Sequence, residues 1–215
     1  MNFPYLFFID MELKFHCLKC GNCCHEYNFE DKTGDLKRIP IFVDELSLLE
    51  EFALINKIKI KFLEDVIFPD IKNEKILVIT YKIVLDGNDK SCPFYNEKLG
   101  CLVEDIKPSA CKAYPIAQKT KDAFNHQLDI DPYCQFIESN KKKLGNITFN
   151  RVKEIFPIEY MDSRNLMNKN KDIILKINHL TNKGLIKIPN TINPEKFNNA
   201  LKSWEREYLS DFDQE

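Results

Sequence analysis

Four cysteines crowd into eight residues near the start of the chain, in residues 17–24, which read CLKCGNCC. Four further cysteines follow singly, all before residue 135. A soluble protein has little packing reason to place four thiols in one short loop, whereas thiolates are favoured ligands of zinc, cuprous copper and iron–sulfur clusters. The sequence therefore predicts a metal–thiolate core built on this loop. We expect all eight cysteines to be metal ligands: Cys17, Cys20, Cys23, Cys24, Cys92, Cys101, Cys111 and Cys134.

The count and spacing of the thiols suggest two coordination spheres of four. Cys17, Cys20 and Cys23 follow a C-x-x-C-x-x-C pattern, which lets one loop occupy three corners of a [4Fe–4S] cluster. Neighbouring cysteines in an extended or turn-like chain tend to point to different sides, so we expect Cys24 to join a second sphere with downstream cysteines. Two structural zinc ions would satisfy the same count. Because the downstream cysteines form no second C-x-x-C knuckle, the pattern favours at least one iron–sulfur cluster over zinc alone.

Two plainer explanations account less well for the loop. A single cysteine on an apolar face is usually buried filling, which would suit any one downstream cysteine but not four thiols in eight residues. A C-x-x-C pair can exchange disulfides, but such motifs usually hold one pair at the start of a helix. Among the nearby histidines, only His25, directly after Cys24, is a candidate for an additional ligand.

Composition limits the class of protein. A chain of 215 residues with 44% apolar residues and sixteen Phe can bury a core of its own, so it does not need a metal merely because it is small. The net charge of −2 gives no electrostatic footprint for nucleic acid, and we expect no nucleic-acid partner.

Location is inferred from missing signals. No apolar stretch approaches the roughly 20 residues of a membrane helix, and the apolar run at residues 3–9 lacks the basic start of a signal peptide. We therefore expect a cytoplasmic protein with no membrane partner, in a compartment where clustered thiols are metal ligands rather than disulfides. A protein partner or protein substrate stays open.

The apolar pattern predicts an α+β fold: a small irregular cysteine-rich metal-binding core with short strands and helices, followed by an α-helical C-terminal region. Asp44 is expected to cap a helix that ends near Lys57. Residues 75–85, rich in Ile, Val and Tyr, predict a strand. Residues 92–103 predict a short hairpin with a cysteine on each arm, and residues 104–113 predict one or two helical turns that carry Cys111.

Beyond the last cysteine the sequence changes to helical patterns. Helices are expected over residues 162–180 and 194–209. We therefore divide the chain into a cysteine-cluster metal-binding domain, residues 1–135, and a helical C-terminal extension, residues 136–215, packed on it. The extension has no cysteine and is expected to donate no metal ligand.

Several of these motifs resemble one family. Residues 15–24, FHCLKCGNCC, resemble the signature of the CxxCxxCC family of cysteine-cluster proteins, which are described as zinc- or iron-chelating. Cys92-Pro93-Phe94 resembles the family's Cys-Pro-aromatic element. Residues 107–115, KPSACKAYP, resemble its Arg-Pro-x-x-Cys-Arg-x-(Phe/Tyr)-Pro element, with Lys107 and Lys112 where arginine is common, so the charge is kept but the forked donor is lost. Cys101 and Cys134 fit its remaining cysteines. The resemblance implies metal binding through the eight cysteines and does not fix the metal.

Three functions are compatible with these observations. The first is a metal-binding protein that holds an iron–sulfur cluster and/or zinc. Some relatives are described as flagellin lysine N-methylases, so the resemblance implies an S-adenosylmethionine-dependent protein-lysine N-methylase as an alternative. The chain has no G-x-G nucleotide loop and no C-x-x-x-C-x-x-C triad to support it. The third is an electron-transfer or redox-sensing iron–sulfur protein. The sequence assigns no catalytic residue.

Overall fold

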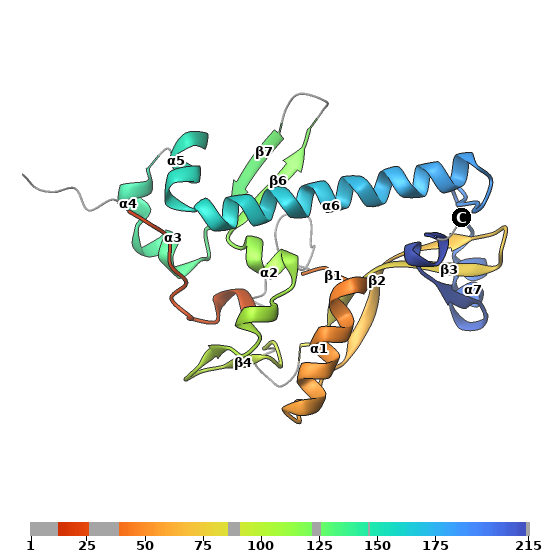
Figure 1. The fold of residues 1–215 in the computed structure, drawn as a ribbon, viewed down its shortest axis with the longest axis horizontal. Coiled ribbons are helices and arrows are strands. Elements are labelled where there is room, and N and C mark those ends of the chain that lie inside the picture. The colour runs from red at the N-terminus through yellow and green to blue at the C-terminus, as the bar shows by residue number, and fades with distance from the viewer. Residues whose placement is uncertain (1–12, 26–38, 86–90, 122–125, 146, 214–215) are drawn as a thin grey trace, which may run out of the picture.

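The computed structural model of the protein describes residues 13–25, 39–85, 91–121, 126–145 and 147–213. Short strands in small sheets are followed by a C-terminal region dominated by helices, which confirms the predicted α+β fold. The molecule is elongated, and one long helix, α6 (Pro157–Asn182), runs along much of its length (Figure 1). The short elements of the cysteine region lie toward the end where α6 begins, and α7 (Pro194–Ser203) lies at the other end.

The main sheet is built around one central strand. Strands β2 (Phe62–Asp70) and β3 (Lys75–Ile83) form an antiparallel hairpin, and β1 (Ile41–Phe42) pairs with β3 on its other side. The strand predicted over residues 75–85 is thereby confirmed. A late strand, β8 (Glu205–Glu207), pairs in parallel with the start of β3. The end of the chain thus completes a sheet that its early part begins.

Helix α1 (Val43–Ile55) begins and ends earlier than the sequence predicts. The prediction that Asp44 caps it is wrong, because Asp44 lies inside the first turn. The start is instead closed by Glu45, whose Oε2 accepts a hydrogen bond from the backbone N–H of Phe42 at 3.0 Å. The helix then buries Leu49 in a core cluster that it shares with the loops carrying the downstream cysteines.

Only short elements lie between β3 and the C-terminal helices. The predicted helical turns over residues 104–113 are split in two, because the residue before a proline is pushed out of the helical region. Here that residue is Lys107, with φ −49° and ψ 137°. The predicted hairpin is present, but the prediction of a cysteine on each arm is wrong, because Cys101 lies on β5 while Cys92 lies before β4 begins. These elements are η2 (Glu104–Ile106), α2 (Ser109–Ala113), the hairpin β4 (Tyr95–Asn96) and β5 (Gly100–Cys101), and the hairpin β6 (Ile116–Thr120) and β7 (His126–Ile130).

The C-terminal region is helical, with one exception. Four apolar residues recur at helical spacing in α6, and Ile173, Ile177 and Leu180 pack into a cluster with Leu77 of β3, whereas the fourth, Ile174, is 59% exposed. The last predicted helix is too long, since α7 ends at Ser203 and the chain turns into strand β8. The division of the chain at residue 135 stays a prediction. The remaining elements are α3 (Gln135–Ser139), α4 (Lys141–Leu144), α5 (Phe149–Ile155) and η3 (Leu209–Phe212).

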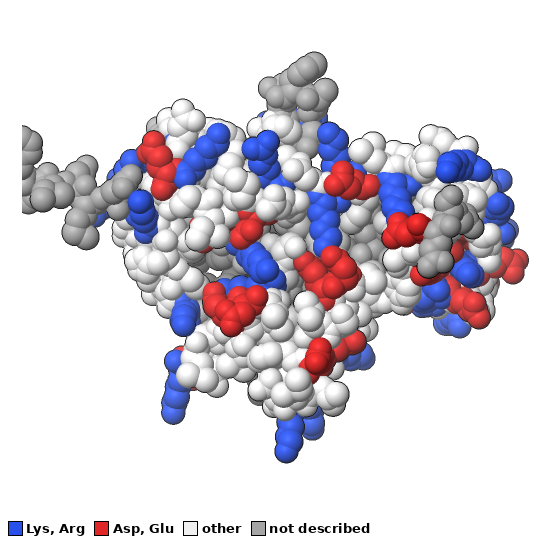
Figure 2. All heavy atoms as spheres, viewed as in Figure 1, with Lys and Arg blue, Asp and Glu red and all other residues white. Residues whose placement is uncertain are grey.

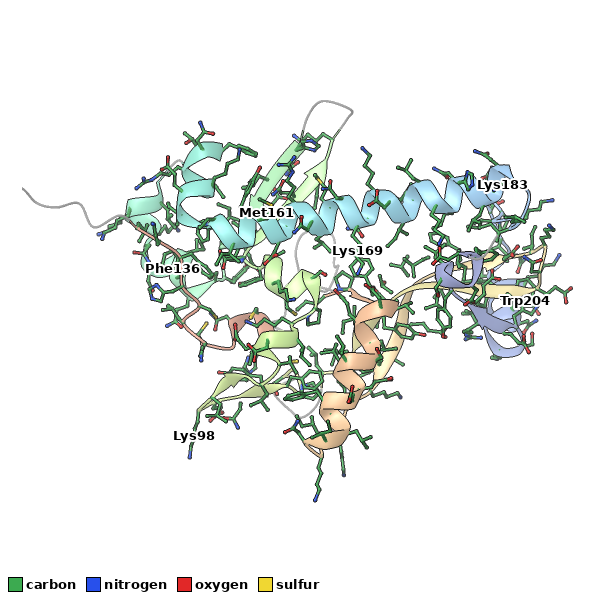
Figure 3. The ribbon with its side chains drawn as sticks, viewed as in Figure 1. Lys98, Phe136, Met161, Lys169, Lys183 and Trp204 are labelled. Carbon is green, nitrogen blue, oxygen red and sulfur yellow. The ribbon has the colours of Figure 1, made fainter. Side chains whose placement is uncertain are left out.

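Charged groups on the surface and apolar clusters in the core are both distributed over the molecule. Lysine and arginine side chains are interspersed with acidic ones on the face shown in Figure 2. Phe136 and Trp204 mark separate apolar clusters near opposite ends of the molecule (Figure 3).

No described helix combines the length and the apolar character needed to cross a membrane. The cytoplasmic location and the expected absence of a nucleic-acid partner stay predictions.

A buried carboxyl group lies where β8 joins the sheet. Glu207 is only 3% exposed, and Asp70 at the end of β2 is fully buried. Asp70 Oδ1 accepts hydrogen bonds from the backbone N–H groups of Lys72 at 3.0 Å and Lys187 at 2.8 Å. Burial, and then the nearby Asp70 carboxylate, raises the pKa of Glu207 from 4.5 to about 7. The folded protein therefore holds the Glu207 proton more tightly than the unfolded chain does.

This raised pKa predicts a fall in stability as the pH rises. Stability from this group is fully present below pH 4.5 and is lost as the pH rises to about 7. We expect Glu207→Gln, which removes the charge and keeps the shape, to raise the melting temperature above pH 7 and to flatten its decline between these values. Thermal unfolding across this pH range checks the prediction. Glu205→Gln, an exposed change in the same strand, should keep the wild-type slope, and an unaltered slope in Glu207→Gln would contradict the argument.

Candidate metal centre

The first cysteine loop is tied to two other cysteine segments. Its last residues form a 3-10 turn, η1 (Asn22–Cys24). The backbone N–H of Cys92 donates to the carbonyl oxygen of Cys24 at 2.6 Å. The side-chain amide of Asn22 donates to the carbonyl oxygen of Tyr133 at 2.9 Å. Because Tyr133 directly precedes Cys134, the two bonds hold the loop between the segments that carry Cys92 and Cys134.

Gly21 fixes the shape of this loop. Its φ of +79° lies in the left-handed region, and a Cβ added there would stand 2.3 Å from the ring of Tyr95. His25 packs against the same two residues. Its Nδ1 lies 2.8 Å from the Gly21 carbonyl oxygen, and its ring packs edge-on against Tyr95 with 5.2 Å between the ring centres. One ring nitrogen of His25, the candidate for an additional ligand, is therefore engaged with the backbone.

Gly21→Ala should loosen the loop from the β4–β5 hairpin. The left-handed φ alone costs about 1–2 kcal/mol for a residue with a Cβ, and the Tyr95 ring must also move. We expect a loss of more than about 2 kcal/mol in unfolding free energy, together with weaker metal retention. Gly184→Ala is a matched control, since Gly184 has φ +68° and nothing within 4 Å of an added Cβ. Thermal unfolding measures the loss of unfolding free energy in both variants. An equal loss in the two would mean that the Tyr95 contact contributes nothing to stability.

Cys23 and Cys24 do not diverge, so the expectation that they point to different sides is wrong. Their sulfurs lie 3.8 Å apart. The reason is local, because the pair lies in the 3-10 turn η1 rather than in extended chain. Neighbours in such a turn are rotated by about 120°, not the 180° of a strand, so rotamer choice can bring them together. Two adjacent thiols are thereby presented to the same side of the loop.

Several cysteine sulfurs accept a backbone N–H from the residue two or three positions further on. The Sγ of Cys17 lies 3.4 Å from the backbone nitrogen of Lys19. At three other cysteines burial raises the pKa of the thiol while such an N–H lowers it. These sulfurs and their donors are Cys92 with Phe94, Cys101 with Val103, and Cys134 with Ile137 and Phe136. Hydrogen bonds of this kind favour the thiolate and orient it, as the outer shell of a metal site does.

Five thiols are close enough to affect one another. Burial raises the pKa of Cys92 to about 11. Burial also raises the pKa of Cys111, as do the charges of Cys23, Cys92 and Cys101. The pKa of Cys24 is raised by its contact with Cys23, by burial, and by Cys92 and Cys101. Mutual repulsion therefore opposes ionisation of these thiols, and a bound cation would reverse that balance, because a metal-coordinated thiol is deprotonated.

Lys107 contributes a positive charge beside the thiols. Its side chain is 16% exposed, and its Nζ lies 2.6 Å from Glu104 Oε1. Burial acts to lower the pKa of Lys107, but the Glu104 hydrogen bond and the charges of Cys101 and Cys17 outweigh burial and raise it. The ammonium group thus offsets part of the negative charge that thiolates would bring to this region.

Glu45 anchors the short helix that carries Cys111. Glu45 Oε1 accepts hydrogen bonds from the hydroxyl of Ser109 and from its backbone N–H, the latter at 2.9 Å. The Nζ of Lys169 lies 3.8 Å from the same oxygen, and the Glu45 side chain is only 15% exposed. The carboxylate that closes the start of α1 therefore also fixes the start of α2. The sequence offers no signal for this contact, because Glu45 and Ser109 are 64 residues apart.

The described cysteines do not form a finished coordination sphere. Within the described residues, no group of three or more His, Cys, Asp or Glu side chains has a spacing that would hold a metal ion. Cys17 is exposed, while Cys134 is buried. The donor set nevertheless fits a thiophilic metal, because it consists of cysteine thiols, several of them with N–H donors at sulfur. The assignment of all eight as ligands stays a prediction.

Comparison with known proteins gives one match. The model of the CxxCxxCC family, described as a putative zinc- or iron-chelating domain, matches residues 16–135. The matched range contains every cysteine of the chain and ends at the first residue of α3. Neither a curated protein nor a solved structure matches the chain.

Proposed function

Since the chain belongs to the CxxCxxCC family of zinc- or iron-chelating domains, we propose that its cysteine region is a metal-binding module in which the metal holds the short elements together. All eight cysteines serve as ligands in this proposal. The protein supplies the thiols on several short segments. The metal would supply a positive charge and bonds to sulfur that link these segments.

One observation supports the proposal: chain segments that carry different cysteines are held together by hydrogen bonds within the protein. The loop of η1 bonds to the backbone at Cys92 and at Tyr133, and α2 with Cys111 is fixed by Glu45. Sulfur atoms in these segments accept backbone N–H groups. A protein that used the cysteines as separate buried residues would have no reason to combine these features.

The distance between Cys23 and Cys24 bears on the choice of metal. Two thiolates on one tetrahedral ion with metal–sulfur bonds of about 2.3 Å stand about 3.8 Å apart, and the two sulfurs are separated by 3.8 Å. In a [4Fe–4S] cluster each cysteine binds a different iron, so the pair does not suit two corners of one such cluster. The separation supports zinc, mononuclear iron or [2Fe–2S] at this pair, with further ligands from Cys92, Cys101 and Cys111.

The remaining thiols have a different neighbourhood. Burial raises the pKa of Cys134, and after opposing N–H bonds the next influences are the charges of Cys20 and Cys23. We infer that Cys20 and Cys134 belong to a second sphere that adjoins the first near Cys23. This division revises the expectation that Cys23 and Cys24 belong to separate spheres. The methylase and the electron-transfer alternatives receive no support from the described contacts.

Metal analysis tests the proposal. The protein is purified without oxygen, its visible spectrum is recorded, and iron, acid-labile sulfide and zinc are measured per chain. We expect at least one equivalent of zinc or iron, bound under reducing conditions. His179→Ala, a change on α6 outside the cysteine region, is the matched control and should leave the metal content unchanged. A soluble, reduced preparation with neither zinc nor iron would refute the proposal, and visible absorption with equal iron and sulfide would show that an iron–sulfur cluster is present.

A further inference from the structure

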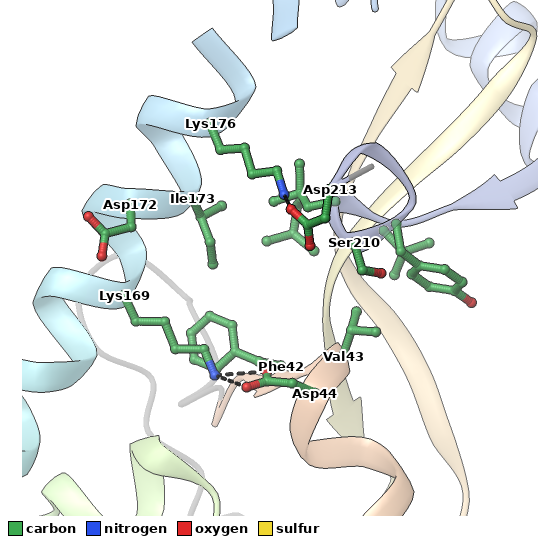
Figure 4. Close-up of a pocket in the computed structure, with 13 residues that line it drawn as sticks. Phe42, Val43, Asp44, Lys169, Asp172, Ile173, Lys176, Ser210 and Asp213 are labelled. Atoms are coloured by element: carbon green, nitrogen blue, oxygen red, sulfur yellow. Dashed lines mark hydrogen bonds and ion pairs between the residues drawn. The ribbon is translucent and has the colours of Figure 1, made fainter. Parts of the chain in front are cut away.

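A cavity of about 420 Å³ lies away from the cysteines, where α6 crosses the start of α1 and the last 3-10 turn, η3. Its wall is mostly apolar and includes Phe42, Val78, Ile79 and Ile173. Val78 and Ile79 come from the central strand β3 and are buried, so the wall is a rigid part of the core. Figure 4 shows the cavity from the side on which two lysines cross it.

Lys169 and Lys176 both extend from α6 across this cavity (Figure 4). They are seven residues apart, which places them two turns apart on the same face of the helix. The Nζ of Lys169 lies 2.8 Å from each carboxylate oxygen of Asp44 and 4.1 Å from the centre of the Phe42 ring. Lys176 pairs with one carboxylate oxygen, Oδ1, of Asp213. Each ammonium group is thus already placed beside an anion at the mouth of an apolar cavity.

The two partners in each pair differ in exposure. The side chains of Lys169 and Lys176 are 29% and 31% exposed, whereas those of Asp44 and Asp213 are 69% and 64% exposed. Exposed ion pairs contribute little to stability, because water and salt screen them. The aspartates can therefore swing into solvent at small cost, while the lysines stay with their stems along the apolar wall. A foreign anion could take the place of either aspartate.

We propose that this cavity binds a small organic anion with an apolar body. The body fills the space over Phe42, Ile79 and Ile173, and a carboxylate, sulfonate or phosphate group pairs with Lys169 or Lys176 in place of the aspartate. A third lining carboxylate, Asp172, points away from the lysines (Figure 4), whereas Glu45, with its Oε1 3.8 Å from the Nζ of Lys169, stays beside that lysine when Asp44 leaves. None of the lining residues is a cysteine, but Lys169 also lies beside Glu45, which fixes the helix that carries Cys111, so metal content is measured in every variant.

Matched probes test the charge preference on the full, metal-loaded chain. The probes are 2-naphthalenesulfonate, 2-naphthalenemethanol and 2-naphthylmethylammonium, which share one apolar body and carry negative, zero and positive charge. Octanoate, used below its micelle concentration, tests a different body. Binding is followed by chemical-shift changes of the protein amides. We expect the two anions to bind at least about tenfold more tightly than the alcohol or the ammonium probe, with shifts in α6, α1 and η3.

Two double variants are expected to change the affinity for the sulfonate in opposite directions. Lys169→Gln combined with Lys176→Gln should weaken sulfonate binding at least about tenfold, while Lys171→Gln, an exposed lysine on the same helix, should not. Asp44→Asn combined with Asp213→Asn should tighten it several-fold, because the competing carboxylates are gone. Both double variants are compared at unchanged metal content. Binding of neither anion, equal binding of all three naphthalenes, preference for the ammonium probe, or weaker binding after the aspartate changes would each overturn the proposal.

Discussion

Stripping the metal from the reduced protein should unfold the cysteine region and leave the sheet and the long helix folded. Structural zinc contributes about 10–16 kcal/mol in small zinc domains, which is comparable with the whole stability of a typical protein. The elements that would lose it are very short: β4 and β5 have two residues each and α2 has five. Elements of this length do not persist alone in water. By contrast, β2, β3 and α6 share apolar clusters that contain no cysteine.

Hydrogen exchange measures this difference along the chain. A strong chelator under reducing conditions should abolish amide protection over residues 91–115, while residues 62–83 and 157–182 keep theirs. Thermal unfolding should lose a transition or shift it strongly downward. Returning the metal should restore both signals, which separates metal loss from irreversible damage. An unchanged melting temperature and unchanged protection in a verified metal-free sample would contradict a structural role for the metal.

The long and periodic elements could be predicted from the sequence, because their signal is local. The strand predicted from the β-branched run in β3 proved correct, and the helical pattern in α6 proved correct for Ile173, Ile177 and Leu180 but not for the exposed Ile174. Some errors occurred where a neighbour distant in sequence decided the outcome, whereas the split at Lys107-Pro108 and the turn at Cys23-Cys24 have local causes. The helix after residue 194 was expected to continue, but residues 205–207 instead pair with β3 and become β8. The cap of α1 is Glu45 rather than Asp44, because the Glu45 carboxylate is also held by Ser109.

The candidate site also has some features that the sequence predicts and others that it does not. The cysteines were predicted to form the site from their spacing in the sequence, and the family match spans all eight, while their role as ligands stays a prediction. How they face one another could not, because it depends on the 3-10 turn at residues 22–24 and on contacts such as Gly21 with Tyr95. Tyr95, Glu45 and Asn22 support the site without carrying metal-binding chemistry. No pattern in the sequence distinguishes such residues from ordinary surface polar and aromatic groups.

Cys23→Ser and Cys24→Ser should each remove the same metal centre. The two sulfurs lie 3.8 Å apart, as two ligands of one tetrahedral ion do. A hydroxyl is a harder and far less acidic ligand than a thiolate, so either change weakens the shared centre most. Since loss of an outer-shell partner already costs 10–100-fold in metal affinity, we expect each variant to lose more than about 100-fold at that centre. Metal counts and spectra on soluble, compact protein measure the effect.

The double variant makes the test sharper. If Cys23 and Cys24 share one ion, Cys23→Ser combined with Cys24→Ser should lose no more metal than either single change, because the centre is already gone. If they serve separate ions, the losses should add. Cys134→Ser provides the comparison, because Cys134 lies in the neighbourhood of Cys20 rather than Cys24 and should deplete the second centre. Additive losses in the double variant would restore the division of the loop between two spheres. They would also leave the close approach of the two sulfurs as a property of the 3-10 turn alone.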